Sequence, residues 1–167
     1  LDKVMKQGLD KVIVAVPEMS IGGSFKDTDL TSYGFFADWH VDPRYNLCTP
    51  GNVGKVDRVV EFMKQTKEHY LICTHATFRF AYERINNASA FDKTLVAIDE
   101  FHHTSAEEGN ILGGIIDDLM NNSSAHIVAM TGSYFRGDAV PIMKPEDEAK
   151  FTQVTYTYYE QLNGYKY

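Results

Sequence analysis

Two adjacent carboxylates, Asp99 and Glu100, are the residues of this sequence best suited to do chemistry. They directly follow an apolar run, Thr94–Ile98, which predicts a buried strand. A carboxylate at a strand end can hold a water of a Mg²⁺ shell, and a neighbouring one can orient and deprotonate an attacking water. Placing two adjacent carboxylates at a strand end costs free energy unless a cation neutralises them. His102, a second residue type that can take part in chemistry, lies two positions after Glu100. The pattern favours a metal–phosphate ligand over a surface turn.

Polar residues also follow the other predicted strands. Apolar runs predict further buried strands at residues 12–16, 70–74 and 126–130, and periodic apolar residues predict helices between them. This alternation indicates an α/β fold in which helices cover both faces of a parallel sheet. Ligands of such sheets bind at the carboxyl ends of the strands. We therefore expect Asp99 to share one sheet edge with five other residues: Pro17, Ser20, Thr74, Thr131 and Ser133.

Composition narrows the class of protein. The 167 residues are 44% hydrophobic and 23% charged, which is typical of a globular domain. No apolar stretch is long enough to span a membrane, and we expect no membrane partner. A net charge of −7 disfavours binding to nucleic acid through a basic stripe, so any such contact must be local. We interpret Cys48 and Cys73 as small core hydrophobes of a cytoplasmic protein.

The order of these motifs resembles a known family. Residues 99–102, Asp-Glu-Phe-His, resemble the D-E-x-H box of superfamily 2 helicases and translocases. Residues 12–25 resemble motif Ia with its flanks, residues 70–78 resemble motif Ib, and residues 131–133 stand where the family has motif III. The resemblance therefore covers nearly the whole chain.

One stretch narrows the resemblance to a branch of the family. Residues 131–138 are similar to the T-A-T-P-F-R-x-D stretch of the branch that includes the type I and type III restriction-enzyme motors. Gly132, Ser133 and Tyr134 depart from that pattern. Thr131 and Ser133 keep hydroxyl groups at the first and third positions of motif III, so we expect this motif to retain its coupling role.

The resemblance implies a RecA-like motor domain with specific residue roles. Asp99 would position Mg²⁺ through a water, Glu100 would be the catalytic base, and His102 would link the nucleotide site to motif III. The remaining implied roles are coupling, at Thr131 and Ser133, and contact with the nucleic-acid backbone, at Pro17, Ser20 and Thr74. The implied cofactors are ATP and Mg²⁺. The implied partners are nucleic acid, with DNA favoured over RNA, and a second RecA-like domain.

The phosphate-binding loop of that family, G-x-x-x-x-G-K-[ST], does not occur in the sequence. Residues 51–56 end in Gly-Lys-Val, but Thr49 stands at the first glycine position and Val56 replaces the hydroxyl. We interpret this segment as a helix N-terminus. Residues 1–167 are then expected to be a partial first motor domain, from motif Ia to motif III, truncated after the Walker A loop. Without that loop and the second motor domain, we expect the piece alone to be inactive and to hold no cofactor tightly.

Two other interpretations stay open. One is a non-catalytic RecA-like module that binds a partner or a nucleotide without turnover. The other is a metal-dependent hydrolase centred on Asp99, Glu100 and His102, although the H-E-x-x-H pattern typical of zinc sites is absent. A lysine-bearing phosphate loop upstream of residue 1 would separate the motor from the binding module.

Overall fold

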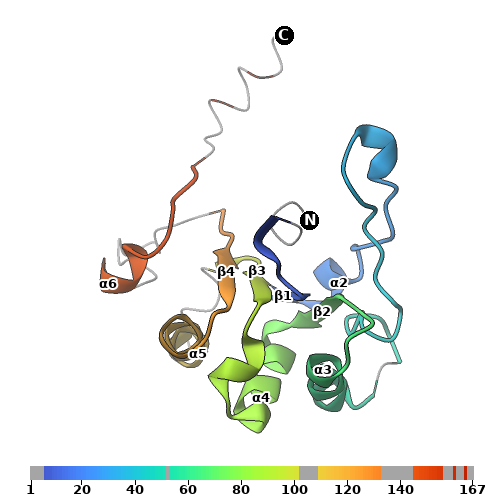
Figure 1. Cartoon of the computed structure of the whole chain (residues 1–167). Helices are drawn as coiled ribbons and strands as arrows, with labels where there is room; N and C mark the ends of the chain where they lie inside the picture. The colour runs from blue at the N-terminus through green and yellow to red at the C-terminus, as the bar shows by residue number, and fades with distance from the viewer. Residues whose placement is uncertain are drawn as a thin grey trace.

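A four-stranded parallel sheet forms the centre of the computed structural model, which describes residues 6–51, 53–101, 109–132, 145–155, 160 and 164. The strand order is β2-β1-β3-β4 (Figure 1). The sequence prediction of an α/β fold with a parallel sheet is confirmed, and the predicted strands differ from the observed ones by at most one residue at an end. The strands are β1 (Lys11–Val16), β2 (Tyr70–Thr74), β3 (Thr94–Ile98) and β4 (His126–Ala129).

Three helices cover one face of this sheet. They are α3 (Lys55–Lys64), α4 (His75–Ile85) and α5 (Gly109–Asn122). Each presents an apolar stripe to the strands, and fully buried Phe62, Phe78 and Leu119 belong to the resulting core. The i, i+3, i+4, i+7 spacing of Val56, Val59, Val60 and Met63 predicts the buried stripe of α3. Val59 is buried as predicted, Val60 is only half-buried, and Phe62 is buried in addition.

The other face of the sheet is covered by less regular structure. The short helix α2 (Met19–Gly22) follows β1, and a long loop containing the 3₁₀ turn η1 (Thr31–Tyr33) comes next. Val12, Val14 and Val16 of β1 pack there against Cys48 and Val41, with Trp39 and Phe25 partly buried beside them. Helices therefore lie on both faces, as predicted, but unequally.

A fifth segment extends the sheet beyond β2. Asn46 forms a parallel bridge with Ile72, the Leu47 N–H donates to the Ile72 carbonyl at 2.8 Å, and the Ile72 N–H donates to the Tyr45 carbonyl at 2.9 Å. This segment therefore pairs with β2 through a single bridge and is not a full strand. The chain passes around this edge from the loop side of the sheet to α3.

Two short elements complete the described structure: the 3₁₀ turn η2 (Ala88–Phe91) and the one-turn helix α6 (Pro145–Glu148). Cys48 and Cys73 are buried and free, and burial raises the pKa of both thiols. This confirms their interpretation as core residues. Within the described part of the chain, every helix is too short or too polar to cross a bilayer.

Lys11 links β1 to the end of α3. Its Nζ donates to the carbonyls of Phe62 and Met63, each at 2.6 Å, and lies 5.2 Å from the centre of the Phe62 ring. Burial lowers the pKa of this ammonium group, while Asp10 opposes that shift. A cation at a helix C-terminus also complements the helix dipole.

We expect Lys11→Met to lower the free energy of unfolding by about 1–2 kcal/mol, because methionine keeps the apolar stem but removes the ammonium donor from two carbonyls. The Phe62 carbonyl would still accept from the Gln65 side-chain amide at 3.3 Å. Urea titration of the 167-residue chain measures this change. Lys64→Met, at an exposed position of the same helix end, is the matched control and should change stability by less than about 0.5 kcal/mol. Equal effects of the two substitutions would contradict the capping role of Lys11.

Candidate functional site

The strand register brings the carboxyl ends of all four strands to one edge of the sheet. Val16 of β1 is opposite Thr74 of β2, Ala15 is opposite Ile98 of β3, and Ile98 is opposite Ala129 of β4. The residues that follow these strand ends therefore lie along one edge, which we call the carboxyl edge. Of the site residues predicted from the sequence, it collects Pro17, Ser20, Thr74, Asp99, Glu100 and Thr131.

Asp99 and Glu100 lie at the centre of this edge. The Asp99 N–H donates to the Ala15 carbonyl at 2.9 Å and continues the β1–β3 ladder by one residue. The Glu100 N–H then donates to Oδ1 of Asp99 at 3.0 Å, and Glu100 takes a left-handed backbone conformation with φ of 48°. Such a conformation costs a non-glycine residue about 1–3 kcal/mol, which the surrounding contacts must offset. The turn therefore holds two carboxylates at a strand end in a fixed, strained geometry.

The residue after this pair anchors the turn to β4. Phe101 is buried, and its N–H donates to the Met130 carbonyl at 2.9 Å. The Met130 N–H donates in turn to the Ile98 carbonyl at 2.8 Å. Thr131, predicted to be a coupling residue, follows Met130 and is half-buried. The main chain thus joins the Asp99–Glu100 turn directly to the segment that contains Thr131.

Thr74 stands at the junction of β2 and α4. It is the N-cap of α4, and its Oγ1 accepts from the Thr77 N–H at 3.3 Å and lies 3.0 Å from the Thr77 hydroxyl. The next residue, His75, is buried, and its Nε2 lies 2.9 Å from the Asp99 carbonyl oxygen. The sequence prediction named Thr74 but not His75 as a site residue.

Pro17 and Ser20 follow β1. Pro17 is half-buried and Ser20 is exposed, with its hydroxyl donating to Oε2 of Glu18 at 3.3 Å. An acid beside Ser20 is unfavourable for a phosphate contact. Lys55, the first residue of α3, places a positive charge beside α2, because its Nζ lies 3.3 Å from Sδ of Met19. The sequence prediction interpreted Lys55 only as part of a helix N-terminus, which the structure confirms.

Two predicted site residues, His102 and Ser133, lie outside the described residues. So does His103, and the described residues contain no group of three side chains that could ligate a metal. The role of His102 in linking the nucleotide site to motif III and the coupling role of Ser133 therefore stay predictions from the sequence.

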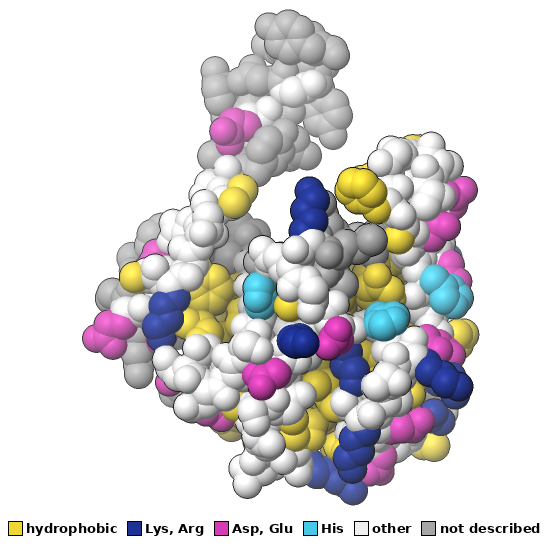
Figure 2. Space-filling view, viewed as in Figure 1, with side chains coloured by type: hydrophobic (Ala, Val, Ile, Leu, Met, Phe, Trp, Pro, Cys, Tyr) yellow, Lys and Arg dark blue, Asp and Glu magenta, His cyan; other side chains and the backbone are white. Residues whose placement is uncertain are grey.

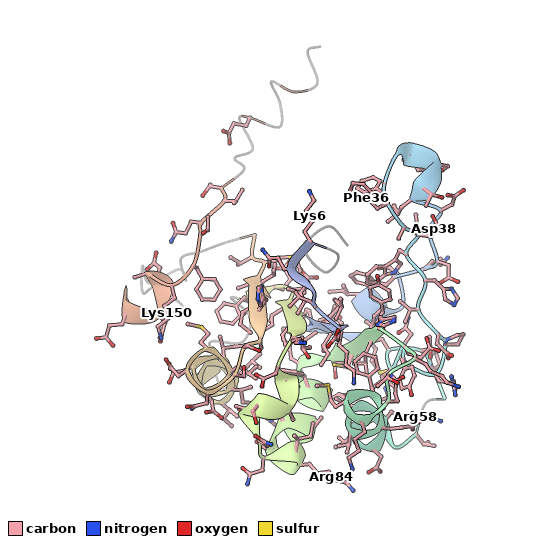
Figure 3. All side chains as sticks on the ribbon, in the orientation of Figure 1. Lys6, Phe36, Asp38, Arg58, Arg84 and Lys150 are labelled. Carbon is pink, nitrogen blue, oxygen red and sulfur yellow. The ribbon has the colours of Figure 1, made fainter. Side chains whose placement is uncertain are left out.

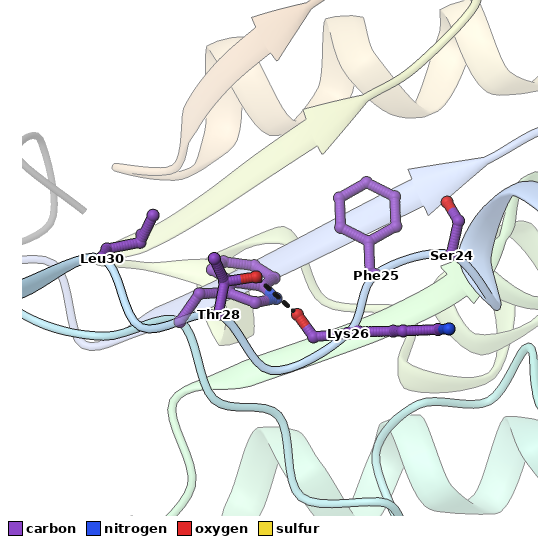
Figure 4. Close-up of a pocket in the computed structure, with 6 residues that line it drawn as sticks. Ser24, Phe25, Lys26, Thr28 and Leu30 are labelled. Carbon is purple, nitrogen blue, oxygen red and sulfur yellow. Dashed lines mark hydrogen bonds between the residues drawn. The ribbon is translucent and has the colours of Figure 1, made fainter. Parts of the chain in front are cut away.

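A shallow hollow of about 370 Å³ opens in the loop after α2 (Figure 4). Its lining is mainly apolar and aromatic, and the Thr28 hydroxyl donates to the Lys26 carbonyl at 3.0 Å beside it. The lining contains no carboxylate and no histidine, so the hollow is separate from the Asp99–Glu100 chemistry. It is formed by Ser24, Phe25, Lys26, Thr28, Leu30 and Trp39.

One face of the molecule carries mixed charge. On the face shown in Figure 2, the Lys and Arg side chains are interspersed with acidic ones and do not form a stripe. Figure 3 shows Arg84 at the lower end of α4, where its guanidinium pairs with Asp57 of α3 at 2.6 Å. In the same view Phe36, 73% exposed, is on the loop that projects away from the sheet.

Comparison with known proteins gives one informative match. The whole chain is 62% identical, over 167 residues, to a protein of Bacillus subtilis (strain 168) named "Putative ATP-dependent helicase YeeB". The chain spans 28% of the length of that protein. No family model matches the chain, and no solved structure matches it significantly.

Proposed function

We propose that these residues are part of an ATP-dependent nucleic-acid helicase or translocase, and that the carboxyl edge is its ATP-hydrolysis site. The observation that carries the proposal is the Asp99–Glu100 pair at the end of the interior strand β3. Its support from comparison is the 62% identity to the protein named "Putative ATP-dependent helicase YeeB". The finer assignment is a first RecA-like domain of the DExH type in superfamily 2, in the branch of the restriction-enzyme motors. Its support is the motif order along residues 12–138.

The donor set at the carboxyl edge fits Mg²⁺. Carboxylate oxygens are the ligands that this hard cation prefers, and it usually keeps several of its waters. Asp99 would hold the ion through one of those waters. When bound, Mg²⁺ neutralises charge that develops on the phosphates during transfer. The phosphate cradle itself would come from a part of the full-length protein other than these 167 residues.

The residues of this chain would then have separate roles in hydrolysis and in coupling. Glu100, held by the turn, would orient the attacking water and accept its proton. His102, Thr131 and Ser133 would pass the state of the nucleotide to the rest of the motor, and the main-chain bond from Phe101 to Met130 supports a connection of this kind. A second RecA-like domain would supply the arginine that stabilises the transition state.

The nucleic-acid contact would lie at the same edge. Pro17, Ser20 and Thr74 would approach the backbone of the strand, and we add Lys55, because its ammonium group lies beside α2. The net charge of −7 indicates that much of the positive charge for tight binding is elsewhere in the full-length protein. We favour DNA over RNA as the nucleic acid along which the motor moves.

The test is ATP turnover by the full-length protein with and without single-stranded DNA or RNA. We expect Mg²⁺-dependent hydrolysis that nucleic acid stimulates, with DNA the better activator. The 167-residue chain alone should show no turnover above background, because it contains no phosphate-binding loop. Hydrolysis by the isolated chain would contradict the motor assignment and favour a metal-dependent hydrolase. Nucleotide binding without turnover in the full-length protein would instead favour a non-catalytic module.

A further inference from the structure

The β1–β3 ladder lacks one hydrogen-bond donor at the point where the Asp99–Glu100 turn begins. In a parallel ladder, a residue whose N–H donates to one strand also accepts, at its carbonyl, from the residue two positions further along that strand. The Asp99 N–H donates to Ala15, so the Asp99 carbonyl should accept from residue 17. Residue 17 is proline, which has no N–H.

The side chain of His75 occupies the place of that donor. Its Nε2 lies 2.9 Å from the Asp99 carbonyl oxygen, a normal hydrogen-bond distance. Because a carbonyl oxygen can only accept, Nε2 carries the proton and donates. His75 begins α4 directly after β2, and β1 lies between β2 and β3, so the imidazole spans the end of β1.

This contact acts on the peptide that joins the two acids. The carbonyl that His75 binds belongs to the Asp99–Glu100 peptide group, and the rotation of that group sets the direction in which Glu100 leaves the strand. Glu100 has the left-handed φ of 48°, which a non-glycine residue keeps only when its surroundings enforce it. His75 is 8% exposed and is the first residue of an 11-residue helix, so its imidazole is held from a rigid element.

We propose that His75 is a positioning residue for the Asp99–Glu100 pair, supplying from α4 the hydrogen bond that Pro17 cannot give. The proposal rests on the proposed function, because it assigns His75 to the hydrolysis site at the carboxyl edge. It also connects two parts of that edge, since Thr74, the proposed nucleic-acid contact, is the residue before His75. A shift of the α4 N-terminus would be transmitted to the Asp99–Glu100 peptide by this hydrogen bond.

Two substitutions at residue 75 in the full-length protein test the role. His75→Leu removes the donor, whereas glutamine can place an amide N–H near the position of Nε2. We expect His75→Leu to lower kcat for ATP about 10–100-fold with little change in KM, and His75→Gln to recover most of that loss. Tyr82→Phe is the matched control, because it removes a hydrogen bond from the same helix, to Asp118 in α5, away from the carboxyl edge. It should leave kcat unchanged.

Hydrogen exchange provides a readout that does not depend on turnover. In the nucleotide-free full-length protein, His75→Leu should speed exchange of the Glu100 and Phe101 amides, and His75→Gln should leave it close to that of the wild type. Equal loss of activity in the leucine, glutamine and Tyr82→Phe variants would show general destabilisation and overturn the proposal. So would unchanged exchange at residues 100 and 101 in His75→Leu.

The outcomes separate this inference from the proposed function. If Glu100→Gln abolishes turnover while His75→Leu changes neither kcat nor exchange, the positioning role is wrong and the hydrolysis site stands. If Glu100→Gln leaves turnover intact, the proposed site is wrong. The exchange result then decides only whether His75 holds the Asp99–Glu100 peptide, and His75 loses its link to ATP hydrolysis.

Discussion

Glu100→Gln in the full-length protein should lower the rate of ATP turnover about 10²–10⁴-fold, the range that a general base contributes. Glutamine has almost the same shape, so it should preserve the turn at residues 99–101 and the bond from Phe101 to Met130. It cannot accept a proton from water at neutral pH. ATP binding, measured with a fluorescent nucleotide at equilibrium, should therefore change little.

The control for this prediction is an acid near the same edge. Glu18 is exposed, follows Pro17, and accepts from Ser20. Glu18→Gln removes one negative charge without touching the Asp99–Glu100 turn, so its turnover should stay within about threefold of the wild type, consistent with a surface substitution. A similar loss in both variants would mean that net charge rather than proton transfer limits the rate.

Gly22→Ala should lower the free energy of unfolding by about 3 kcal/mol, at the upper end of the usual cost of overpacking. A Cβ at residue 22 would lie 2.2 Å from Sγ and 2.5 Å from Cβ of Cys48, and 3.2 Å from Cγ2 of Val16. Cys48 is buried and its Cβ cannot move without the backbone, so α2 would have to shift away from β1 and residues 45–48. The loss should appear in urea titration of the 167-residue chain, followed by the fluorescence of Trp39, its single tryptophan.

Gly23→Ala is the matched control, because a Cβ there would approach no side chain and would lie 3.4 Å from the Met19 carbonyl oxygen. It changes the same residue type at the next position and should alter stability by less than about 1 kcal/mol. Equal effects would show that backbone entropy, rather than the approach of α2 to Cys48, explains the Gly22 result. The contact bears on the proposed function because α2 carries Ser20, a proposed nucleic-acid contact.

The strands were predictable because each is a short apolar run that ends in polar residues. Residues 70–74 and 94–98 are strands at the predicted bounds. Strands of a parallel sheet are buried on both faces, so their sequences are continuous apolar runs whose ends are easy to locate. The gathering of Pro17, Thr74 and Asp99 at one edge followed from parallel topology alone. Helix faces were harder: the α3 pattern pointed to Val60, but tertiary packing buries Phe62 instead.

The proposed role of His75 could not be predicted from the sequence. It depends on strand order, because only the placement of β1 between β2 and β3 puts Pro17, which has no N–H, opposite the Asp99 carbonyl. Strand order is set by packing and crossover geometry, which no local pattern encodes. The sequence did contain one signal, a proline directly after a buried strand, since proline cannot donate to a ladder.

The most direct test of the central claim is a structure of the full-length Glu100→Gln protein with ATP and Mg²⁺. We expect the ATP phosphates at the carboxyl edge, Asp99 hydrogen-bonded to a water of the Mg²⁺ shell, and the residue 100 side chain facing the γ-phosphate. Nucleotide bound elsewhere, with Asp99 and residue 100 remote from the metal, would contradict the assignment of this edge as the hydrolysis site.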